Sequence, residues 1–168
     1  MQKRIRFVQG NEACVEGALY AGVSFYAGYP ITPSTSIIEA FGRYAGKYRV
    51  EADTGRLRVA IVQAEDELAA IGIVIGASWN GARACTATSG AGVSLMTELL
   101  GLGYFAEVPR VLINVQRVGP STGMPTKTEQ GDLLQALWGR DGESPVPVIA
   151  AQSPADCFDA AIEASRIA

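Results

Sequence analysis

The sequence predicts an α/β domain with a mostly parallel sheet and helices on both of its faces. Short apolar runs rich in β-branched residues alternate along the chain with longer segments of helical character. Turns that contain Gly or Pro separate these segments. Such alternation is typical of sheets whose parallel strands are joined by helices.

The composition is that of an ordinary globular protein. The chain has 168 residues, of which 48% are apolar and 18% charged, enough for one domain with a sizeable core. The net charge is −3 and no long basic run occurs, so neither nucleic acid nor a membrane surface is an expected partner. The start lacks an apolar signal core and no apolar run reaches membrane-spanning length, which predicts a cytoplasmic protein.

The absence of histidine narrows the possible chemistry. It excludes histidine triads, imidazole acid–base catalysis and most zinc sites. Cys14, Cys85 and Cys157 are widely spaced with no Cys-x-x-Cys pair, which predicts small buried residues rather than ligands of an iron–sulfur or zinc site. Any catalysis must therefore use carboxylates, hydroxyls, arginine, backbone groups or a cofactor.

A helix, a strand and a second helix are expected first. Asn11 is a good cap for a helix over residues 12–21. The apolar run 23–27 is then expected to be a strand. Two prolines bar regular structure within residues 29–35, whose hydroxyl side chains suit the cap of a helix over residues 36–48.

The middle of the chain predicts two strand–helix pairs. Residues 59–63 form a short apolar run that suits a buried strand, and the apolar segment 68–80 suits a buried helix. A second strand is expected over residues 82–88. Residues 89–92 contain two glycines and predict a tight turn into a helix over residues 93–106.

A long polar loop interrupts the last third of the chain. It follows an expected strand over residues 110–116 and covers residues 117–131, which carry prolines, glycines and hydroxyl residues but almost nothing apolar. A loop of this length inside a compact domain is usually functional or mobile. One or two helical turns over 132–138 and a last strand over 147–150 are expected after it.

The final helix is expected to begin with Ser153 as its cap and Pro154 at its first position. The sequence stops at Ala168 while this helix is still amphipathic. We therefore expect residues 1–168 to form a single domain cut from a longer subunit.

Three acids, Glu65, Asp66 and Glu67, follow the strand expected at 59–63. Acids near a helix N-terminus are stabilised by the helix dipole, which accounts for Asp66 and Glu67 as first-turn residues. The same interpretation applies to Glu65. A carboxylate at the carboxyl end of a buried strand, however, also lies where open α/β sheets bind ligands. From these residues alone, both interpretations of Glu65 stay open.

Polar groups follow several of the expected strands. In a parallel sheet the loops after the strands gather along one edge, so a carboxylate, hydroxyls, an arginine and helix N-termini are expected to converge. These loops cover residues 29–35, 65–67, 89–92 and 117–128. Arg117 is either a clamp for a carboxylate or a surface cation at a strand end.

A nucleotide site is an alternative for the turn at Gly90 and Gly92. The turn follows a strand and precedes a helix, as in dinucleotide-binding folds. Leu95 takes the place of the third glycine, and no acid lies on a following strand. No phosphate-binding Gly-x-x-x-x-Gly-Lys motif occurs.

Four stretches together carry a resemblance to a known family. They are Gly28-Tyr-Pro-Ile-Thr-Pro-Ser34, Gln63-Ala-Glu-Asp-Glu67, Thr88-Ser-Gly90, and Arg117 with Ser121-Thr-Gly-Met-Pro-Thr126. In order and spacing, from Gly10 to Ala168, the chain resembles the α subunit of 2-oxoacid:ferredoxin oxidoreductases. The 2-oxoglutarate enzymes are the most similar type and the branched-chain 2-oxoacid enzymes the next. Ala91 stands where the family carries Pro.

The resemblance implies that this is the pyrimidine-binding module for thiamine diphosphate. In such a module a carboxylate, here Glu65, bonds to the aminopyrimidine ring and favours the imino tautomer that removes a proton from the thiazolium ring. Burial beneath the cofactor would shorten that bond. The cofactor-binding residues implied are Tyr29, Pro30, Ile31, Glu65, Ser89 and Gly90. The substrate-binding residues implied are Thr32, Arg117, Thr122 and Thr126.

The resemblance also implies a partner. The sequence contains neither a Gly-Asp-Gly stretch followed by Asn for magnesium nor a cysteine set for a cluster. Magnesium and a [4Fe-4S] cluster are therefore expected on a β subunit that shares the thiamine diphosphate, with no metal site on this chain. The implied complex also includes the remaining α-subunit domain, takes coenzyme A and ferredoxin, and allows a homodimer of heterodimers.

The activity implied is oxidative decarboxylation of a 2-oxoacid, in particular 2-oxoglutarate, to acyl-CoA with electrons passed to ferredoxin. The chain alone is expected to be inactive without its β partner. One alternative is a non-catalytic assembly module of the same fold, which would be expected to have lost Glu65, Thr32 or Arg117. Another is a nucleotide-binding domain.

Overall fold

The computed structural model describes residues 5–168 and contains one parallel four-stranded sheet in the order β2-β1-β3-β4. Residue Phe25 of β1 is in register with Ala60 of β2 and with Ala84 of β3, and Cys85 of β3 is in register with Val111 of β4. The strands are β1 (Phe25–Gly28), β2 (Ala60–Gln63), β3 (Ala84–Thr88) and β4 (Val111–Asn114). The predicted parallel α/β architecture is confirmed.

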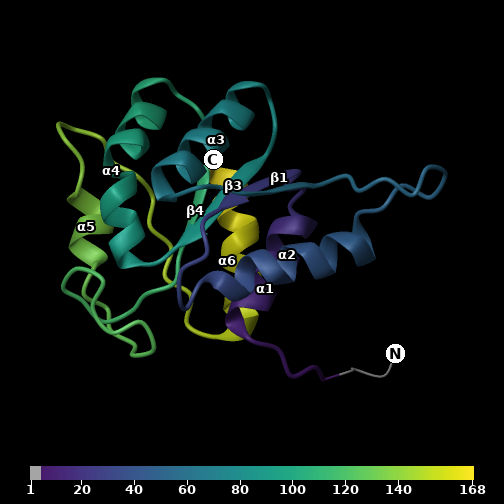
Figure 1. The fold of residues 1–168 in the computed structure, drawn as a ribbon, viewed down its shortest axis with the longest axis horizontal. Helices are drawn as coiled ribbons and strands as arrows, with labels where there is room; N and C mark the ends of the chain where they lie inside the picture. The colour runs from purple at the N-terminus through teal and green to yellow at the C-terminus, as the bar shows by residue number, and fades with distance from the viewer. Residues whose placement is uncertain (1–4) are drawn as a thin grey trace.

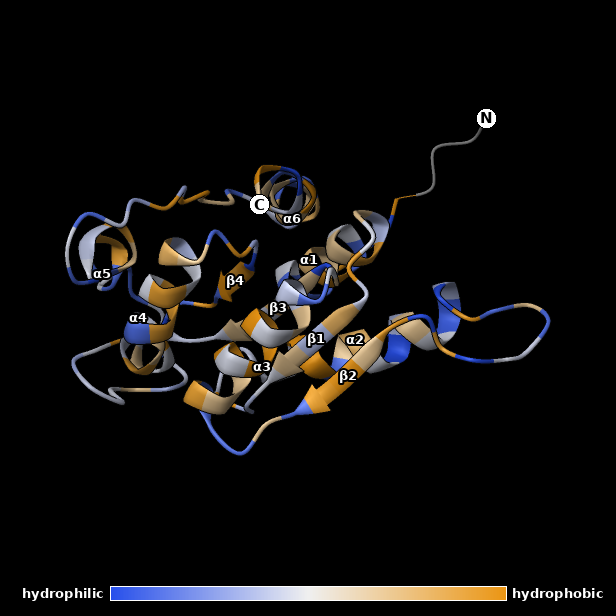
Figure 2. Cartoon of the chain, turned by 90° about the horizontal axis from the view of Figure 1, so that it is seen from above, coloured by the Kyte–Doolittle hydropathy of each residue, from blue (hydrophilic) through white to orange (hydrophobic). Residues whose placement is uncertain are grey.

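Helices cover both faces of this sheet. The helices are α1 (Gly10–Tyr20), α2 (Thr35–Tyr48), α3 (Glu67–Trp79), α4 (Gly90–Phe105), α5 (Leu133–Trp138) and α6 (Pro154–Ile167). Figure 1 shows α3 and α4 together, away from α1, α2 and α6, and Figure 2 shows the sheet between α6 and α3. None of the helices in residues 5–168 has the length and apolar character needed to cross a membrane.

Each face of the sheet has its own core. On one face, side chains of α1, α2 and α6 pack against the strands, and the ring of Tyr26 stacks on that of Phe41 with centroids 4.5 Å apart. On the other face, α3 and α4 pack together around Ile71 and Met96, which are fully buried. Apolar burial on both faces explains why the central strand β3 is buried along its whole length.

The first and last helices cross closely at Gly17. A Cβ atom at this position would overlap the backbone carbonyl oxygen of Phe158 and lie 3.1 Å from the Cβ atom of Ala161. The ring of Tyr20 packs beside that of Phe158, with centroids 5.8 Å apart. Glycine therefore permits a backbone approach that any side chain would prevent.

We expect Gly17→Ala to lower the free energy of unfolding by about 1–3 kcal/mol, because the added methyl group forces α6 away from α1. Gly42→Ala is the matched control, since a Cβ atom there meets nothing within 4 Å in the middle of α2. That change should raise stability by about 0.5–1 kcal/mol. Urea unfolding followed by circular dichroism measures both, and equal midpoints would contradict the close crossing.

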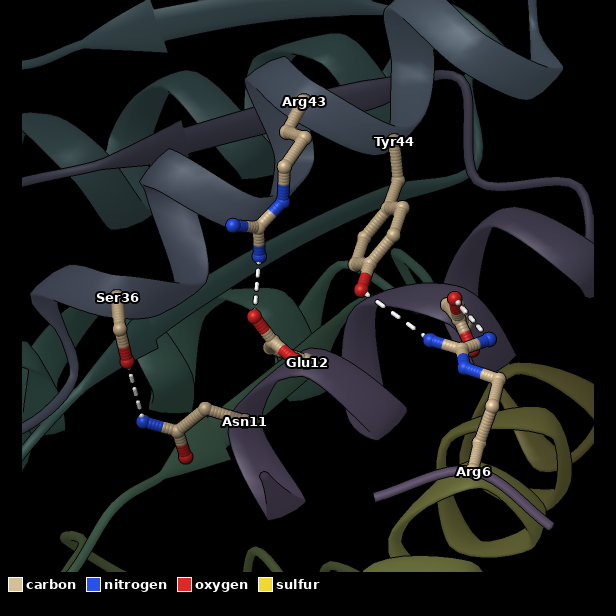
Figure 3. Close-up of polar contacts among 7 residues, drawn as sticks. Arg6, Asn11, Glu12, Ser36, Arg43 and Tyr44 are labelled. Carbon is tan, nitrogen blue, oxygen red and sulfur yellow. Dashed lines mark hydrogen bonds and ion pairs between the residues drawn. The ribbon is translucent and has the colours of Figure 1, made fainter. Parts of the chain in front are cut away.

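The prediction that Asn11 caps the first helix is wrong. This residue lies inside α1, whose N-cap is Gln9, so it does not cap the helix. Its side-chain amide instead donates to Oγ of Ser36 at 2.9 Å (Figure 3). The same amide donates to the carbonyl oxygen of Pro33 at 3.1 Å. Arg43 of α2 bonds to Glu12 in the same view. Polar contacts thus fix the start of α2, and the loop before it, against α1.

Three further predictions need correction. Residues 147–150 form no strand and are largely exposed, since no neighbouring strand offers them a ladder. Strand β2 is at the edge of the sheet and is partly exposed rather than buried. Residues 90–92 form the first turn of α4 rather than a separate turn before it.

The expected Ser153 cap is confirmed, because its Oγ accepts the amide of Asp156 at 3.1 Å.

The cysteines lie in the layer between the sheet and α1 and α6. Cys85 is fully buried, and burial raises the pKa of its thiol. Burial, with the neighbouring thiol of Cys157, raises the pKa of Cys14 to about 12. All three are free thiols, and within residues 5–168 no group of three or more metal-ligating side chains occurs.

Candidate functional site

The loops after the four strands gather at one edge of the sheet, because all of its strands run parallel. At neighbouring strands β1 and β3 the chain leaves toward opposite faces. After β1 the chain enters α2, which packs with α1 on one face. After β3 it enters α4, which packs with α3 on the other face. Ligands in open α/β folds bind at such a divergence. The candidate site therefore lies between residues 29–34 and Ser89.

The three neighbouring acids have different structural roles. Asp66 caps α3, and its Oδ1 accepts the amide of Ala69 at 2.7 Å. Glu67 is buried, and its Cγ would lie 3.0 Å from a Cβ atom at Gly92 in the first turn of α4. Glu65 is exposed and forms no hydrogen bond or ion pair with residues 5–168. It is thus the acid whose carboxylate is available to a ligand.

A backbone bond holds Glu65 beside the loop that follows β1. The amide of Ala64 donates to the carbonyl oxygen of Gly28 at 2.9 Å, so the chain on either side of this bond is fixed. Tyr29, next after Gly28, is 39% exposed, and Pro30 and Ile31 are half-buried. The structure therefore brings Glu65 close in space to the predicted cofactor residues 29–31.

Arg117 and Thr32 are in direct contact although 85 positions apart in the sequence. The Nη1 of Arg117 donates to the carbonyl oxygen of Thr32 at 2.7 Å. The arginine is only 7% exposed, and its buried Nε has no partner among residues 5–168. A buried N–H without an acceptor is costly, so the guanidinium has hydrogen-bonding capacity that the described residues leave unused. The clamp interpretation of Arg117 fits this geometry better than a surface cation.

Ser89 and Gly90 lie at the positive N-terminal end of α4. Ser89 is the N-cap residue and fully buried, and its Oγ has no partner within the described chain. Gly90 lines a cavity of about 290 Å³ together with Arg117. The other lining residues are Ala91, Ser94, Val118, Gly119, Pro120, Ser121, Glu129, Gly131, Asp132 and Gln135. The helix N-terminus and the guanidinium favour an anionic group in this cavity, whereas the carboxylates of Glu129 and Asp132 in its lining oppose one.

The polar loop 117–131 has no helix or strand but is held by backbone bonds. The amide of Val118 donates to the oxygen of Lys127 at 3.0 Å, and that of Met124 to the oxygen of Val118 at 3.2 Å. Gly123 has φ +54°, and a side chain there would overlap the carbonyl group of Val118. Thr122 and Thr126 are exposed and do not line the cavity. Both threonines belong to the loop that follows Arg117, and neither forms a hydrogen bond with it in the described chain.

One residue of the site was not predicted. Asp132 is 8% exposed, lines the cavity, and accepts hydrogen bonds from the side-chain amides of Asn114 and Gln116. The sequence offers only a weak signal for it, namely two amide residues in alternation at the end of a strand.

Comparisons with known proteins identify the family of this chain. Residues 16–168 match the family model described as pyruvate flavodoxin/ferredoxin oxidoreductase, thiamine diphosphate-binding. The chain is 46% identical over 165 residues to the 2-oxoglutarate synthase subunit KorA of Methanocaldococcus jannaschii, covering 98% of this chain and 43% of that relative. It is 48% identical over 168 residues to the 2-oxoglutarate oxidoreductase subunit KorA of Mycobacterium tuberculosis, covering 97% and 24%.

A solved structure is also similar. The 2-oxoglutarate:ferredoxin oxidoreductase from Magnetococcus marinus, with 2-oxoglutarate, coenzyme A and succinyl-CoA bound, superimposes with a TM-score of 0.86 at 39% identity. The match covers 94% of this chain and 26% of that one. The chain thus spans less than half the length of each relative named here. It belongs to the pyruvate flavodoxin/ferredoxin oxidoreductase family and constitutes a thiamine diphosphate-binding domain of that family.

Proposed function

We propose that this domain forms the pyrimidine-binding half of the active site in a 2-oxoacid:ferredoxin oxidoreductase that acts on 2-oxoglutarate. The observation that carries the proposal is Arg117, a buried guanidinium bonded to Thr32 with its Nε unpartnered at the ligand-binding edge of the sheet. The names of the KorA relatives and of the similar solved structure support 2-oxoglutarate as the substrate.

The residues present fit thiamine diphosphate. The exposed carboxylate of Glu65 has no partner in residues 5–168, and the buried Oγ of Ser89 lacks one as well. When bound, the cofactor would supply a nucleophilic carbon and an electron sink for decarboxylation of the oxoacid. Glu65 would hold the proton that it shares with the pyrimidine ring nitrogen. Tyr29, Pro30, Ile31, Ser89 and Gly90 would form the surrounding wall.

Arg117 would bind the carboxylate of the oxoacid. Nη1 is bonded to Thr32 and Nε is buried, so a bidentate carboxylate on the Nε–Nη2 edge would require the groups that cover Nε to move. Thr32 would contact the substrate from the loop after β1. Thr122 and Thr126 would join the pocket once the loop 117–131 moves or a partner covers it.

The remaining components would come from elsewhere in the complex. We propose that residues 1–168 form one pyrimidine-binding domain of a longer α subunit, whose β partner carries magnesium and the [4Fe-4S] cluster. Coenzyme A would accept the acyl group and ferredoxin the electrons. Exposed apolar side chains support a protein partner, notably Phe105 at 87%, Trp138 at 72% and Trp79 at 67% exposure.

The test is oxoacid- and coenzyme A-dependent reduction of a viologen dye by the full-length α subunit assembled with its β partner. We expect activity with 2-oxoglutarate to exceed that with pyruvate and 2-oxoisovalerate by about tenfold or more, since buried polar contacts discriminate at this level. The α subunit alone should be inactive. A complex that is inactive with all three acids would favour a non-catalytic assembly module instead.

A further inference from the structure

Asp132 connects three parts of the site that are far apart in the sequence. It follows the loop 117–131 and precedes α5, and its carboxylate is 8% exposed. Oδ2 accepts the amide of Asn114 at 2.6 Å, and Oδ1 accepts the amide of Gln116. The same carboxylate lies against the first residue of α4, because a Cβ atom at Gly90 would be 2.9 Å from Oδ2.

The two amide residues and Arg117 lie on opposite sides of one extended segment. Side chains in such a segment alternate, so Asn114 and Gln116 point one way and Val115 and Arg117 the other. Val115 packs against the core formed with α1 and α2, and its amide continues the ladder to Thr88 at 2.9 Å. Asp132 therefore bonds to the side chains on one side of residues 114–117, and Arg117 reaches Thr32 from the other side.

Asp132 pairs with neutral amides rather than with a cation, which leaves the charge of Arg117 unpaired among residues 5–168. Both of its oxygens accept from neutral donors, and in the described chain it forms no ion pair with Arg117. The guanidinium thus keeps its charge for an anion in the shared cavity, while the carboxylate provides fixed acceptors.

We propose that Asp132 is a positioning residue for the oxoacid-binding Arg117, acting through Gln116 and anchoring the loop 117–131 beside the N-terminus of α4. The inference rests on the proposed function of Arg117. It assigns Asp132 a role in substrate affinity rather than in the chemical step, because its carboxylate is engaged with the protein's own amides.

The kinetic test uses full-length α subunit assembled with its β partner. Asp132→Ala should raise the KM for 2-oxoglutarate by about 10- to 100-fold, because a small displacement of a binding group has effects of this size. The kcat at saturation should change less than about threefold. The matched control is Asp141→Ala, which removes an exposed aspartate from the turn after α5 and should leave both constants unchanged.

Asp132→Asn separates hydrogen bonding from charge. The new amide retains an oxygen to accept from Gln116. Its nitrogen can donate to Oδ1 of Asn114, which is buried without a partner among residues 5–168, once the Asn114 amide turns over so that Oδ1 takes the place of Nδ2. We expect its KM to lie within about threefold of wild type. A KM for Asp132→Ala equal to that of wild type overturns the proposal, as does an Asp132→Asn variant as impaired as Asp132→Ala.

Hydrogen exchange gives a second readout that does not depend on activity. The amides of Val118, Met124 and Lys127 bond within the loop, and they should exchange about tenfold faster in Asp132→Ala than in wild type. Strand amides of β3 should not change, and Asp132→Asn should restore loop protection. Unchanged loop exchange in Asp132→Ala contradicts the anchoring role. If the assembled wild-type complex has no oxoacid activity, the proposed function is wrong, but the role of Asp132 is still tested. In that case the exchange rates of the loop amides show whether Asp132 anchors this segment.

Discussion

Glu65→Gln is expected to lower oxoacid-dependent viologen reduction by the assembled complex by about 10²–10⁴-fold. The substitution keeps the size of the side chain and its ability to hydrogen-bond, but it removes the charge that holds a proton on the pyrimidine ring. Because the side chain of Glu65 is exposed and forms no hydrogen bond or ion pair with residues 5–168, the fold should be unaffected. Thiamine diphosphate should still bind, within about tenfold of wild-type affinity.

The neighbouring Asp66 provides the matched control for this experiment. Asp66→Asn removes a charge one position away but retains a good cap for α3, whose Ala69 amide then bonds to an amide oxygen. We expect near wild-type activity from it. Equal activity of Glu65→Gln and wild type would mean that another group carries the proton. A loss shared by both variants would point to the electrostatics of the whole acidic stretch.

The structure separates the three acids in a way that the sequence could not. All three follow a strand, and each satisfies the rule for acids near a helix N-terminus. Burial of Glu67 depends on Gly92, which permits close packing of α4 and lies 25 positions later. Only the family resemblance distinguished Glu65 beforehand, and its availability became evident from the three-dimensional contacts.

Arg117→Met is expected to lower kcat/KM for 2-oxoglutarate by about 10²–10³-fold, chiefly through KM, because it removes a bidentate partner of the substrate carboxylate. Stability should fall by no more than about 3 kcal/mol, the upper value for the single hydrogen bond from this charged donor to Thr32. Arg117→Lys keeps the charge but not the paired N–H groups, and it should recover only part of the loss.

Lys127→Ala is the control for charge in the same loop. It removes an exposed cation and should leave kcat/KM within about twofold of wild type, since exposed charges are strongly screened. Steady-state kinetics at two salt concentrations measure all three variants. An Arg117→Met enzyme with unchanged KM would show that the oxoacid binds elsewhere.

Local patterns predicted the order of the elements, because apolar runs and Gly or Pro turns depend on neighbouring residues in the sequence. The predictions failed where a residue's contacts are with residues far away in the sequence. Asn11 satisfies the rules for a cap, yet its donors serve Pro33 and Ser36 across a helix interface. Residues 147–150 have strand character but no neighbouring strand. Asp132 stands in an unremarkable polar stretch, and its role follows only from amides on the preceding strand.

The close crossing of α1 and α6 has a consequence for biosynthesis. Its contacts join Gly17 to Phe158 and Ala161, so they close a chain segment of roughly 140 residues at an entropic cost of about 4 kcal/mol. On a translating ribosome the glycine-bearing side of α1 emerges long before α6 exists. The nascent chain must therefore keep that surface uncovered until translation has passed Ala161, and chaperones that bind exposed apolar segments would find α1 accessible during this interval.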